Sequence, residues 1–187
     1  MNVVTRQRMD KASFFDWTER QVRKFELVDG VVVMMVNVTR HHARICTNIV
    51  AALLGRLDRS QYDITRGDFA IETGERSVRY ADVMVEPFGA GGKDRSTLSA
   101  LLLVEVLSPS SMHIDFHDKL HEYQAVPALG TYIICAQDGR RAWAWTRQSG
   151  AWPKEPQIFD AADALIDVPV LGISLPIAEI YRGLEVN

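Results

Sequence analysis

Three charged residues lie in settings that disfavour charge, and Glu105 is the first of them. It interrupts the apolar run 101–107, whose lack of polar alternation predicts a central strand covered on both faces. A carboxylate buried in such a strand is strongly destabilising unless it is paired, protonated or bound to a metal ion. A structural ion pair with an arginine or lysine and a functional role therefore both remain open for Glu105.

Asp82 presents the same problem in a second apolar segment, 80–86. Strand periodicity predicts that Asp82 lies inside this strand, on the face of Tyr80 and Met84. If Asp82 and Glu105 lay on neighbouring strands, their repulsion would raise the pKa of one carboxyl or recruit a cation. Two carboxylates with water molecules suit Mg²⁺, which prefers oxygen ligands and keeps part of its hydration. The alternative is two unrelated buried acids, each neutralised separately.

Lys119 is the third residue. The segment 115–125 predicts an amphipathic helix whose apolar stripe includes Tyr123. On that helix Lys119 falls at the margin of the stripe, whereas Glu122 points further out. From there Lys119 could reach along the sheet toward the strand ends. From the helix alone, the favoured interpretation is a surface lysine paired with Asp115 one turn earlier.

The histidines give only a weak metal signature. His41 and His42 are neighbours and cannot share one face of a helix. Three others are spaced four residues apart and could line one face: His113, His117 and His121. No HExxH pattern accompanies them, so solvated histidines are the favoured interpretation and zinc chelation is the alternative.

The two cysteines and the N-terminal segment bear on location. Cys46 and Cys135 are far apart and form no CxxC pair, which predicts buried free thiols. The N-terminal segment has no apolar stretch typical of a signal peptide. The longest wholly apolar run, 101–104, is far too short to span a bilayer. We therefore expect a cytoplasmic protein with no membrane partner.

Length and charge set the broad class. With 187 residues, 47% of them hydrophobic, the chain can form one compact domain over 1–187. Its formal charge of −3 counts modestly against nonspecific wrapping of nucleic acid, which usually requires a basic excess. A local basic patch could still form from the arginines 56, 59, 66, 76, 79, 140, 141 and 147.

The order of strand and helix signals predicts the fold class. Asp29-Gly30 between two apolar runs predicts a hairpin of 24–28 and 31–36, and Asp138-Gly139 predicts a second hairpin of 131–136 and 141–146. Other strands are predicted at 62–66, 68–72, 80–86, 101–107, 152–159 and 165–168, and helices at 13–20, 40–57, 115–125 and 176–182. This order indicates a mixed β-sheet flanked by helices, an α/β or α+β fold with N-terminal and C-terminal β-hairpins.

The spacing of these residues also resembles a known family. The block Glu105-Val106-Leu107-Ser108-Pro109-Ser110-Ser111, followed by Asp115, Lys119 and Tyr123, resembles the bacterial Uma-two family of restriction endonucleases in the PD-(D/E)xK nuclease superfamily. Three upstream segments are similar to other motifs of that family: Glu26-Leu27-Val28-Asp29-Gly30, His42-Ala43-Arg44-Ile45 and Tyr80-Ala81-Asp82-Val83. The similarity spans about residues 9–184.

The resemblance implies a restriction-endonuclease-like domain and a role for each matched residue. Asp82 would be the motif aspartate and Glu105 the motif acid, together holding Mg²⁺ or Mn²⁺. The superfamily lysine normally lies two residues after the acid, where this chain has Leu107. The resemblance therefore implies that Lys119 supplies the catalytic amine from a migrated position. Glu26 would be an accessory acid of the same site.

The implied function is that of a Mg²⁺-dependent endonuclease that hydrolyses phosphodiester bonds of nucleic acid, with DNA as the expected partner. The resemblance also implies a homodimer, because many nucleases of this superfamily pair to cut two strands. One alternative is a catalytically silent module that keeps the nuclease fold and has a binding or regulatory role. The acidic net charge and the absence of a lysine two residues after Glu105 favour this alternative. A purely structural protein with Asp82 and Glu105 in ion pairs is the more distant alternative.

Overall fold

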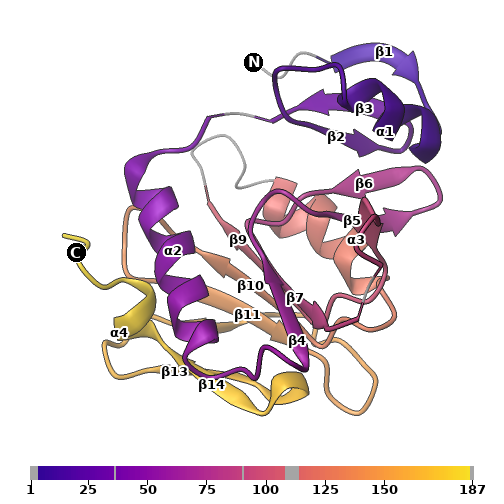
Figure 1. Ribbon diagram of the computed structural model, residues 1–187. Helices are drawn as coiled ribbons and strands as arrows, with labels where there is room; N and C mark the ends of the chain where they lie inside the picture. The colour runs from indigo at the N-terminus through magenta and orange to yellow at the C-terminus, as the bar shows by residue number, and fades with distance from the viewer. Residues whose placement is uncertain (1–3, 36, 90, 108–113, 186–187) are drawn as a thin grey trace.

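The computed structural model describes residues 4–35, 37–89, 91–107 and 114–185, and it is built around a six-stranded mixed sheet (Figure 1). The strand order is β12-β11-β10-β9-β7-β4, in which β9 and β10 run parallel and the other neighbours antiparallel. The strands are β4 (Tyr62–Thr65), β7 (Val83–Pro87), β9 (Leu102–Val106), β10 (Thr131–Cys135), β11 (Ala142–Thr146) and β12 (Gln157–Phe159).

A second six-stranded sheet, in the order β1-β3-β2-β6-β5-β8, lies beside one end of the main sheet (Figure 1). Its strands are β1 (Val4–Arg8), β2 (Phe25–Val28), β3 (Val31–Met34), β5 (Ala70–Gly74), β6 (Ser77–Arg79) and β8 (Ser96–Thr97). The β2–β3 turn confirms the predicted hairpin, since Asp29 and Gly30 have φ angles of 46° and 77°, as a type I′ turn requires. The predicted hairpin of β10 and β11 is confirmed as well.

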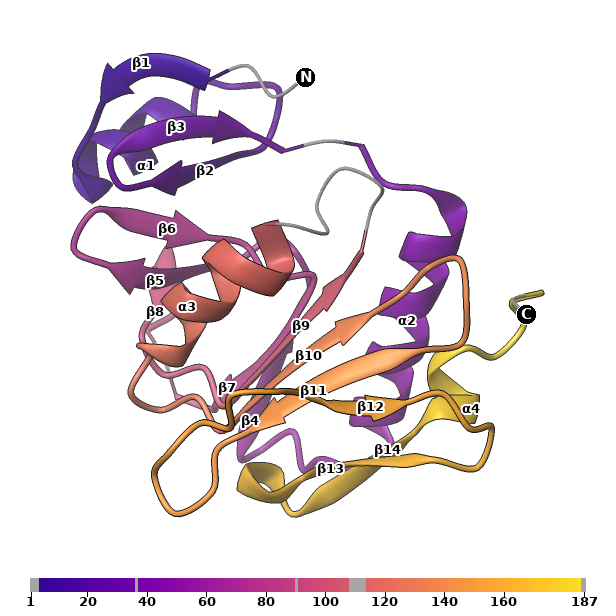
Figure 2. The same ribbon diagram turned by 180° about the vertical axis from the view of Figure 1, so that it is seen from behind.

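The helices and a small two-stranded sheet cover the two faces of the main sheet (Figures 1 and 2). Helix α2 (Arg40–Leu54) and the two-stranded sheet of β13 (Leu165–Val168) and β14 (Ile173–Pro176) lie on one face, and α3 (Leu120–Gln124) lies on the other. The remaining short elements are α1 (Lys11–Thr18), η1 (Ile114–Lys119), η2 (Pro169–Leu171) and α4 (Ile177–Ile180). In the part of the chain that the structure describes, each helix is too short or too polar to serve as a membrane span.

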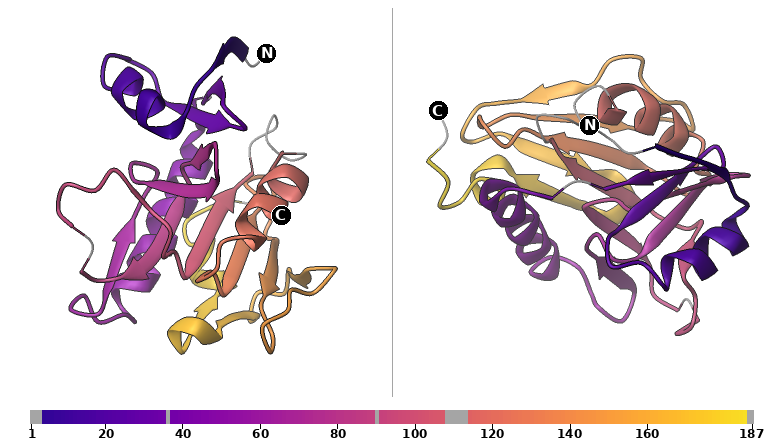
Figure 3. Two further views of the ribbon diagram at one scale, coloured as in Figure 1. Left: turned by 90° about the vertical axis from the view of Figure 1, so that its right-hand side faces the viewer. Right: turned by 90° about the horizontal axis from the view of Figure 1, so that it is seen from above.

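The core on the α2 side explains why that helix is held firmly. Ile45, Ile49 and Leu53 recur every four residues and are all fully buried against Val83 and Val104 of the sheet. Burial of an aliphatic side chain of this size contributes about 1.5–3 kcal/mol. Helix α2 is thereby fixed along one face of the main sheet, beside the strands in both views of Figure 3.

Several predicted boundaries were wrong for local reasons. Helix α1 is capped by Asp10, whose side chain accepts from the Ser13 amide, so Ser13 itself is not the cap. The predicted helix 115–125 is a π-helical turn, η1, that continues as α3. Pro176 ends β14, and only Ile177–Ile180 is helical at the C-terminal end. The short strands β1, β6, β8 and β14 were not predicted.

Candidate functional site

The pairing of β7 with β9 brings the two predicted acids together. Val83 pairs with Val104 and Met84 with Leu103, so the same antiparallel register continued by one residue places Asp82 opposite Glu105. The amide of Val106 donates a hydrogen bond of 2.8 Å to Oδ2 of Asp82. Both acids therefore lie at the same end of two neighbouring strands.

Asp82 does not lie inside the strand, and the prediction that placed it there was wrong. The strand begins at Val83, and Asp82 occupies a bend just before it. The bend releases Asp82 from strict alternation, so its carboxylate contacts His42 of α2 instead of lying with Met84 on the α3 face. Glu105 keeps the strand geometry and contacts residues on the α3 side, as the central position of β9 predicts.

Glu105 is buried against two donors from the segment that follows it in the chain. Lys119 Nζ and the Tyr123 hydroxyl donate hydrogen bonds of 2.9 Å and 2.7 Å to Oε1 of Glu105. Glu105 and Lys119 are only 3% and 7% exposed. Lys119, which the family resemblance placed in the same site, is thus in direct contact with Glu105. The side chain of Asp115, the alternative partner, lies outside the described residues, as do residues 108–111 of the family block and His113.

Glu26 joins the same site through two cations. Its carboxylate lies 3.0 Å from Nη1 of Arg79 and 3.8 Å from Nζ of Lys119, and it accepts a hydrogen bond from the amide of Tyr80. Burial alone would raise the pKa of Glu26, but Lys119, Arg79 and that amide outweigh burial and hold the pKa below its usual value. Glu26 is therefore held as a carboxylate in the buried interior.

Arg79 and Glu122 complete a charge network that sequence analysis did not find. Arg79 is 2% exposed, and its Nε and Nη2 donate to the two carboxylate oxygens of Glu122 at 2.9 Å and 2.5 Å. Glu122 points further out than Lys119, as predicted, with side-chain exposures of 20% and 9%, but its carboxylate is engaged by the buried Arg79. We call Glu26, Arg79, Glu105, Lys119 and Glu122 the charge network.

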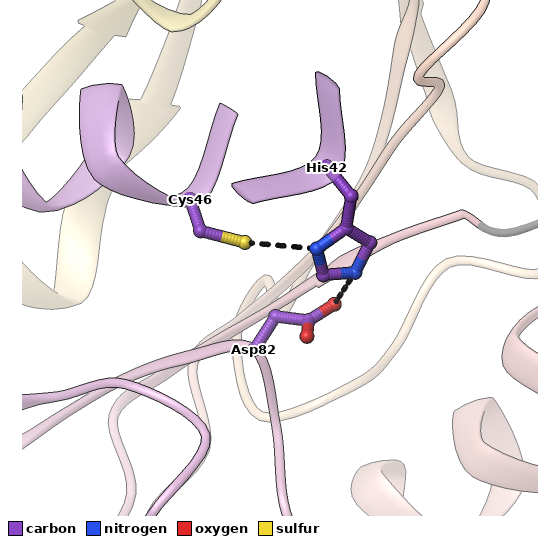
Figure 4. Close-up of side chains that lie close together, drawn as sticks. All are labelled: His42, Cys46 and Asp82. Carbon is purple, nitrogen blue, oxygen red and sulfur yellow. Dashed lines mark hydrogen bonds and ion pairs between the residues drawn. The ribbon is translucent and has the colours of Figure 1, made fainter. Parts of the chain in front are cut away.

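A second group lies on the other side of Asp82 (Figure 4). Nε2 of His42 is 3.0 Å from Oδ2 of Asp82, and Nδ1 of the same ring is 3.5 Å from Sγ of Cys46. The two α2 residues are four apart and so share a helix face. We call His42, Cys46 and Asp82 the His42 cluster. Sequence analysis matched His42 to a family motif but gave it no role.

The two groups set the protonation of Asp82 and Cys46 in opposite ways. Burial raises the pKa of Asp82, but His42, the Val106 amide and Lys119 outweigh burial and lower the pKa below its usual value. Burial, reinforced by the charge of Asp82, raises the pKa of the Cys46 thiol to about 12. Asp82 is thus an anion at neutral pH, and Cys46 is a protonated thiol. The prediction of buried free thiols at Cys46 and Cys135 is confirmed.

A cavity of about 660 Å³ opens onto the His42 cluster. Arg23, Lys24 and Arg66 contribute positive charge to its lining, whereas Glu105 and Lys119 are not among its lining residues. The side chain of Asp82 is 19% exposed, against 4% for that of Glu105. Asp82 is therefore the acid of the pair that a ligand in the cavity meets first.

The other arginines do not form a basic patch with this cavity. Arg56 pairs with Glu179, Arg141 with Asp160, and Arg147 donates to main-chain carbonyls near the end of α3. The described members of the histidine series, His117 and His121, are exposed.

The local charge balance favours a cation. Among the described residues of the charge network and the His42 cluster, four carboxylates face one guanidinium group and one amino group, those of Arg79 and Lys119. Two formal negative charges remain when neither His42 nor the cavity-lining Arg66 is counted. Two oxygen donors at neighbouring strand ends and an excess of negative charge fit a hydrated divalent ion of the Mg²⁺ or Mn²⁺ type.

Comparison with known proteins places this arrangement in context. The Uma2 family model, described as "Putative restriction endonuclease", matches residues 12–178. Two uncharacterized proteins of Synechocystis sp. are similar: sll1609 is 27% identical over 73% of this chain and 80% of its own length, and slr1290 is 26% identical over 95% and 93%. A crystal structure from Anabaena variabilis, titled "a putative nuclease belonging to DUF820", superposes with a TM-score of 0.71 at 16% identity over 86% of this chain and 91% of that one. This likeness confirms the predicted mixed-sheet fold as one shared with that protein.

Proposed function

Because the chain belongs to the Uma2 family of restriction endonucleases, we propose that it is a metal-dependent endonuclease that hydrolyses phosphodiester bonds of nucleic acid, with DNA as the expected substrate. The observation that carries the proposal is the β7–β9 pairing, which brings Asp82 and Glu105 to one sheet end beside Lys119. The whole chain, residues 1–187, would act as one domain of this kind.

In this proposal Asp82 and Glu105 hold Mg²⁺ or Mn²⁺. A bound ion would supply an activated water and would neutralise charge that develops on the scissile phosphate. The Val106 amide orients the Asp82 carboxylate through its hydrogen bond, and the low pKa of Asp82 keeps that ligand ionised at neutral pH.

The remaining residues would bind and position the substrate. Lys119 holds a positive charge beside Glu105, where it can donate to the attacking water or to a phosphoryl oxygen. Glu26, which is itself paired with Arg79, faces that amino group at 3.8 Å and helps to hold it in place. Arg23, Lys24 and Arg66 would bind flanking phosphates at the mouth of the cavity.

A second candidate is a nuclease-fold module that binds nucleic acid without cutting it. The observation that favours it is the engagement of Lys119 with both Glu105 and Glu26, which makes the lysine part of a satisfied buried network. Such a module would bind nucleic acid through the basic mouth of the cavity and would show no turnover.

Cleavage of a labelled duplex and a labelled single strand in Mg²⁺ or Mn²⁺ separates the two candidates. The wild type should cut at least one substrate, and Glu105→Gln should lower the rate by more than about 100-fold, because even partners of metal ligands are worth roughly 10- to 100-fold. Glu86→Gln is the matched control, since Glu86 is an equally buried glutamate at the other end of β7. Two results would favour the non-cutting module over the endonuclease. One is binding of nucleic acid without metal-dependent cleavage, and the other is equal cleavage rates for Glu105→Gln and Glu86→Gln.

A further inference from the structure

The His42 cluster contains donors that a Mg²⁺ nuclease does not require. A thiol and an imidazole are softer ligands than carboxylates, and they suit Zn²⁺ and Co²⁺ rather than Mg²⁺. One ligand atom from each of His42, Cys46 and Asp82 lies within 4.8 Å of the other two. The ligand set therefore differs in chemistry from the Asp82–Glu105 pair but shares Asp82 with it.

We propose that His42, Cys46 and Asp82 form a binding site for a Zn²⁺-class ion, and that occupation of this site withdraws Asp82 from the hydrolytic site. The inhibitory consequence rests on the proposed function, but the binding itself does not. The two sites are then mutually exclusive, and the identity of the available metal decides whether the chain cuts.

The spacing of the donors fits the coordination of such an ion. With Zn–S and Zn–N bonds of about 2.3 and 2.0–2.1 Å, tetrahedral donors lie roughly 3.3–3.7 Å apart. Cys46 Sγ is 3.5 Å from His42 Nδ1, which already meets this distance. Asp82 faces the other ring nitrogen at 3.0 Å, so binding of one ion by all three residues requires the carboxylate of Asp82 and the ring of His42 to shift relative to each other (Figure 4).

The surroundings supply an entry path and a fourth ligand. All three residues line the cavity of about 660 Å³, through which an ion and a water molecule can reach them. Sites with three protein ligands and one water are common for Zn²⁺. Binding requires loss of the Cys46 proton, so one proton is released to solvent as the metal–sulfur bond forms.

A hydrolase-like Cys–His–Asp triad would show similar contacts, but burial argues against it. Cys46 is 2% exposed, and its thiol has a pKa of about 12, so a free thiolate nucleophile is not available at neutral pH. A metal ion overcomes this obstacle because it binds the thiolate directly and replaces the proton. The same burial therefore disfavours nucleophilic catalysis but permits coordination.

Titration of the full chain with Co²⁺ alone tests the site without any need for catalytic activity. The wild type should develop a thiolate-to-cobalt charge-transfer band that saturates at one ion per chain. Cys46→Ser should lack the band, and Cys135→Ser is the matched control that should keep it, because Cys135 is the other buried thiol of the chain. His42→Gln and Asp82→Asn should each weaken Co²⁺ binding by at least about 10-fold.

Three outcomes would overturn the site: no band in the wild type, a band that persists in Cys46→Ser, or a band that disappears in Cys135→Ser. Far-ultraviolet circular dichroism checks the fold of every variant. If Cys46→Ser does not fold, Cys46→Ala and the affinity of His42→Gln decide the same question.

Glu105→Gln separates this proposal from the proposed function. It should keep the cobalt band even though it loses the hydrolytic site. In a cleavage assay with Mg²⁺, added Zn²⁺ should inhibit the wild type, and Cys46→Ser should need at least about 10-fold more Zn²⁺ for the same inhibition. If the wild type shows the cobalt band but cleaves no substrate, the endonuclease proposal is refuted and the proposal of a Zn²⁺-class site stands. Equal inhibition of both proteins refutes the mutual exclusion.

Discussion

The two ends of β7 each carry an acid, and the two acids behave in opposite ways. Asp82, just before the strand, has a pKa that is lowered by His42, the Val106 amide and Lys119 despite its burial. Glu86, near the other end, has a pKa that is raised by burial and by the neighbouring carboxylates of Asp63 and Asp94. Burial of an acid is common to both ends, so it does not by itself mark a functional site.

The two ends of β7 differ because positively charged side chains and hydrogen-bond donors surround the acids at the Asp82 end. At the Asp82 end, Arg79 and Lys119 form ion pairs with Glu26, Glu122 and Glu105. At the Glu86 end, Asp63 is the direct cross-strand neighbour of Glu86, so the nearest charge has the same sign. An ionised, preorganised group of carboxylates is what binding of a divalent cation requires.

The largest expected effect is on stability at the Asp82 end. Arg79→Met should lower the free energy of unfolding by about 3–5 kcal/mol, because it leaves Glu26 and Glu122 without their shared buried partner. Urea unfolding measures this change. Arg56→Met is the control: its pair with Glu179 is more exposed and should be worth at most about 1 kcal/mol. Similar losses in the two variants would contradict a special role for the buried network.

The next largest effect concerns turnover. Lys119→Met should lower the cleavage rate by about 100- to 1000-fold, the range found when a positioned donor to a developing charge is removed. Lys11→Met removes a lysine that pairs with Glu72 away from the site, and it should cut at the wild-type rate. A Lys119→Met protein that cuts normally would remove Lys119 from the mechanism.

Glu86 and Glu26 should contribute to the stability of the protein with opposite dependences on pH. The folded-state pKa of Glu86 is raised, so its contribution to stability is present below its ordinary value of 4.5 and is lost as pH rises through the raised pKa. The pKa of Glu26 is lowered, so its contribution is present above 4.5 and is lost as pH falls through the lowered pKa.

Unfolding free energies of the wild type, Glu86→Gln and Glu26→Gln across this pH range measure the two contributions. Relative to the wild type, Glu86→Gln should gain stability as pH rises above 4.5, and Glu26→Gln should lose less stability on acidification below 4.5. Parallel curves of unfolding free energy against pH for all three proteins would show that neither the pKa of Glu86 nor that of Glu26 is shifted as described.

The smallest expected effect is on binding of nucleic acid without metal. Arg66→Ala should reduce the slope of the logarithm of affinity against the logarithm of salt concentration by about 0.9, the value for one phosphate contact. Arg59→Ala is the control, because Arg59 is exposed and precedes β4 near the Glu86 end. Fluorescence anisotropy at several salt concentrations gives both slopes, and equal slopes would place the nucleic acid elsewhere.

The sequence allowed the local features to be predicted where one residue pattern decides the structure. The Asp29-Gly30 turn, the buried strand of Glu105 and the apolar stripe of α2 are of this kind. The pairing of Lys119 with Glu105 was suggested by family spacing, and the contact between them is present. Mg²⁺ binding, catalysis and a homodimer remain predictions.

The partners that complete the site could not be predicted because they come from distant segments. Arg79 joins Glu26 and Glu122 across separations of 53 and 43 residues, and local periodicity carries no information about such contacts. The bend at Asp82 and the π-helical turn that ends at Lys119 break the regular periods on which the predictions relied. His42 and Cys46 share one helix face, but only the fold brings Asp82 to them.

Calorimetric titration with Mn²⁺ tests the central claim most directly, because it asks whether Asp82 and Glu105 form one site. The wild type should bind a single Mn²⁺, and Asp82→Asn and Glu105→Gln should each weaken binding by at least about 10-fold. Glu86→Gln should bind as the wild type does, since the described charges that act on Glu86 are those of Asp63 and Asp94, which have the same sign. Absence of Mn²⁺ uptake by the wild type, or binding that survives in both Asp82→Asn and Glu105→Gln, would contradict the account.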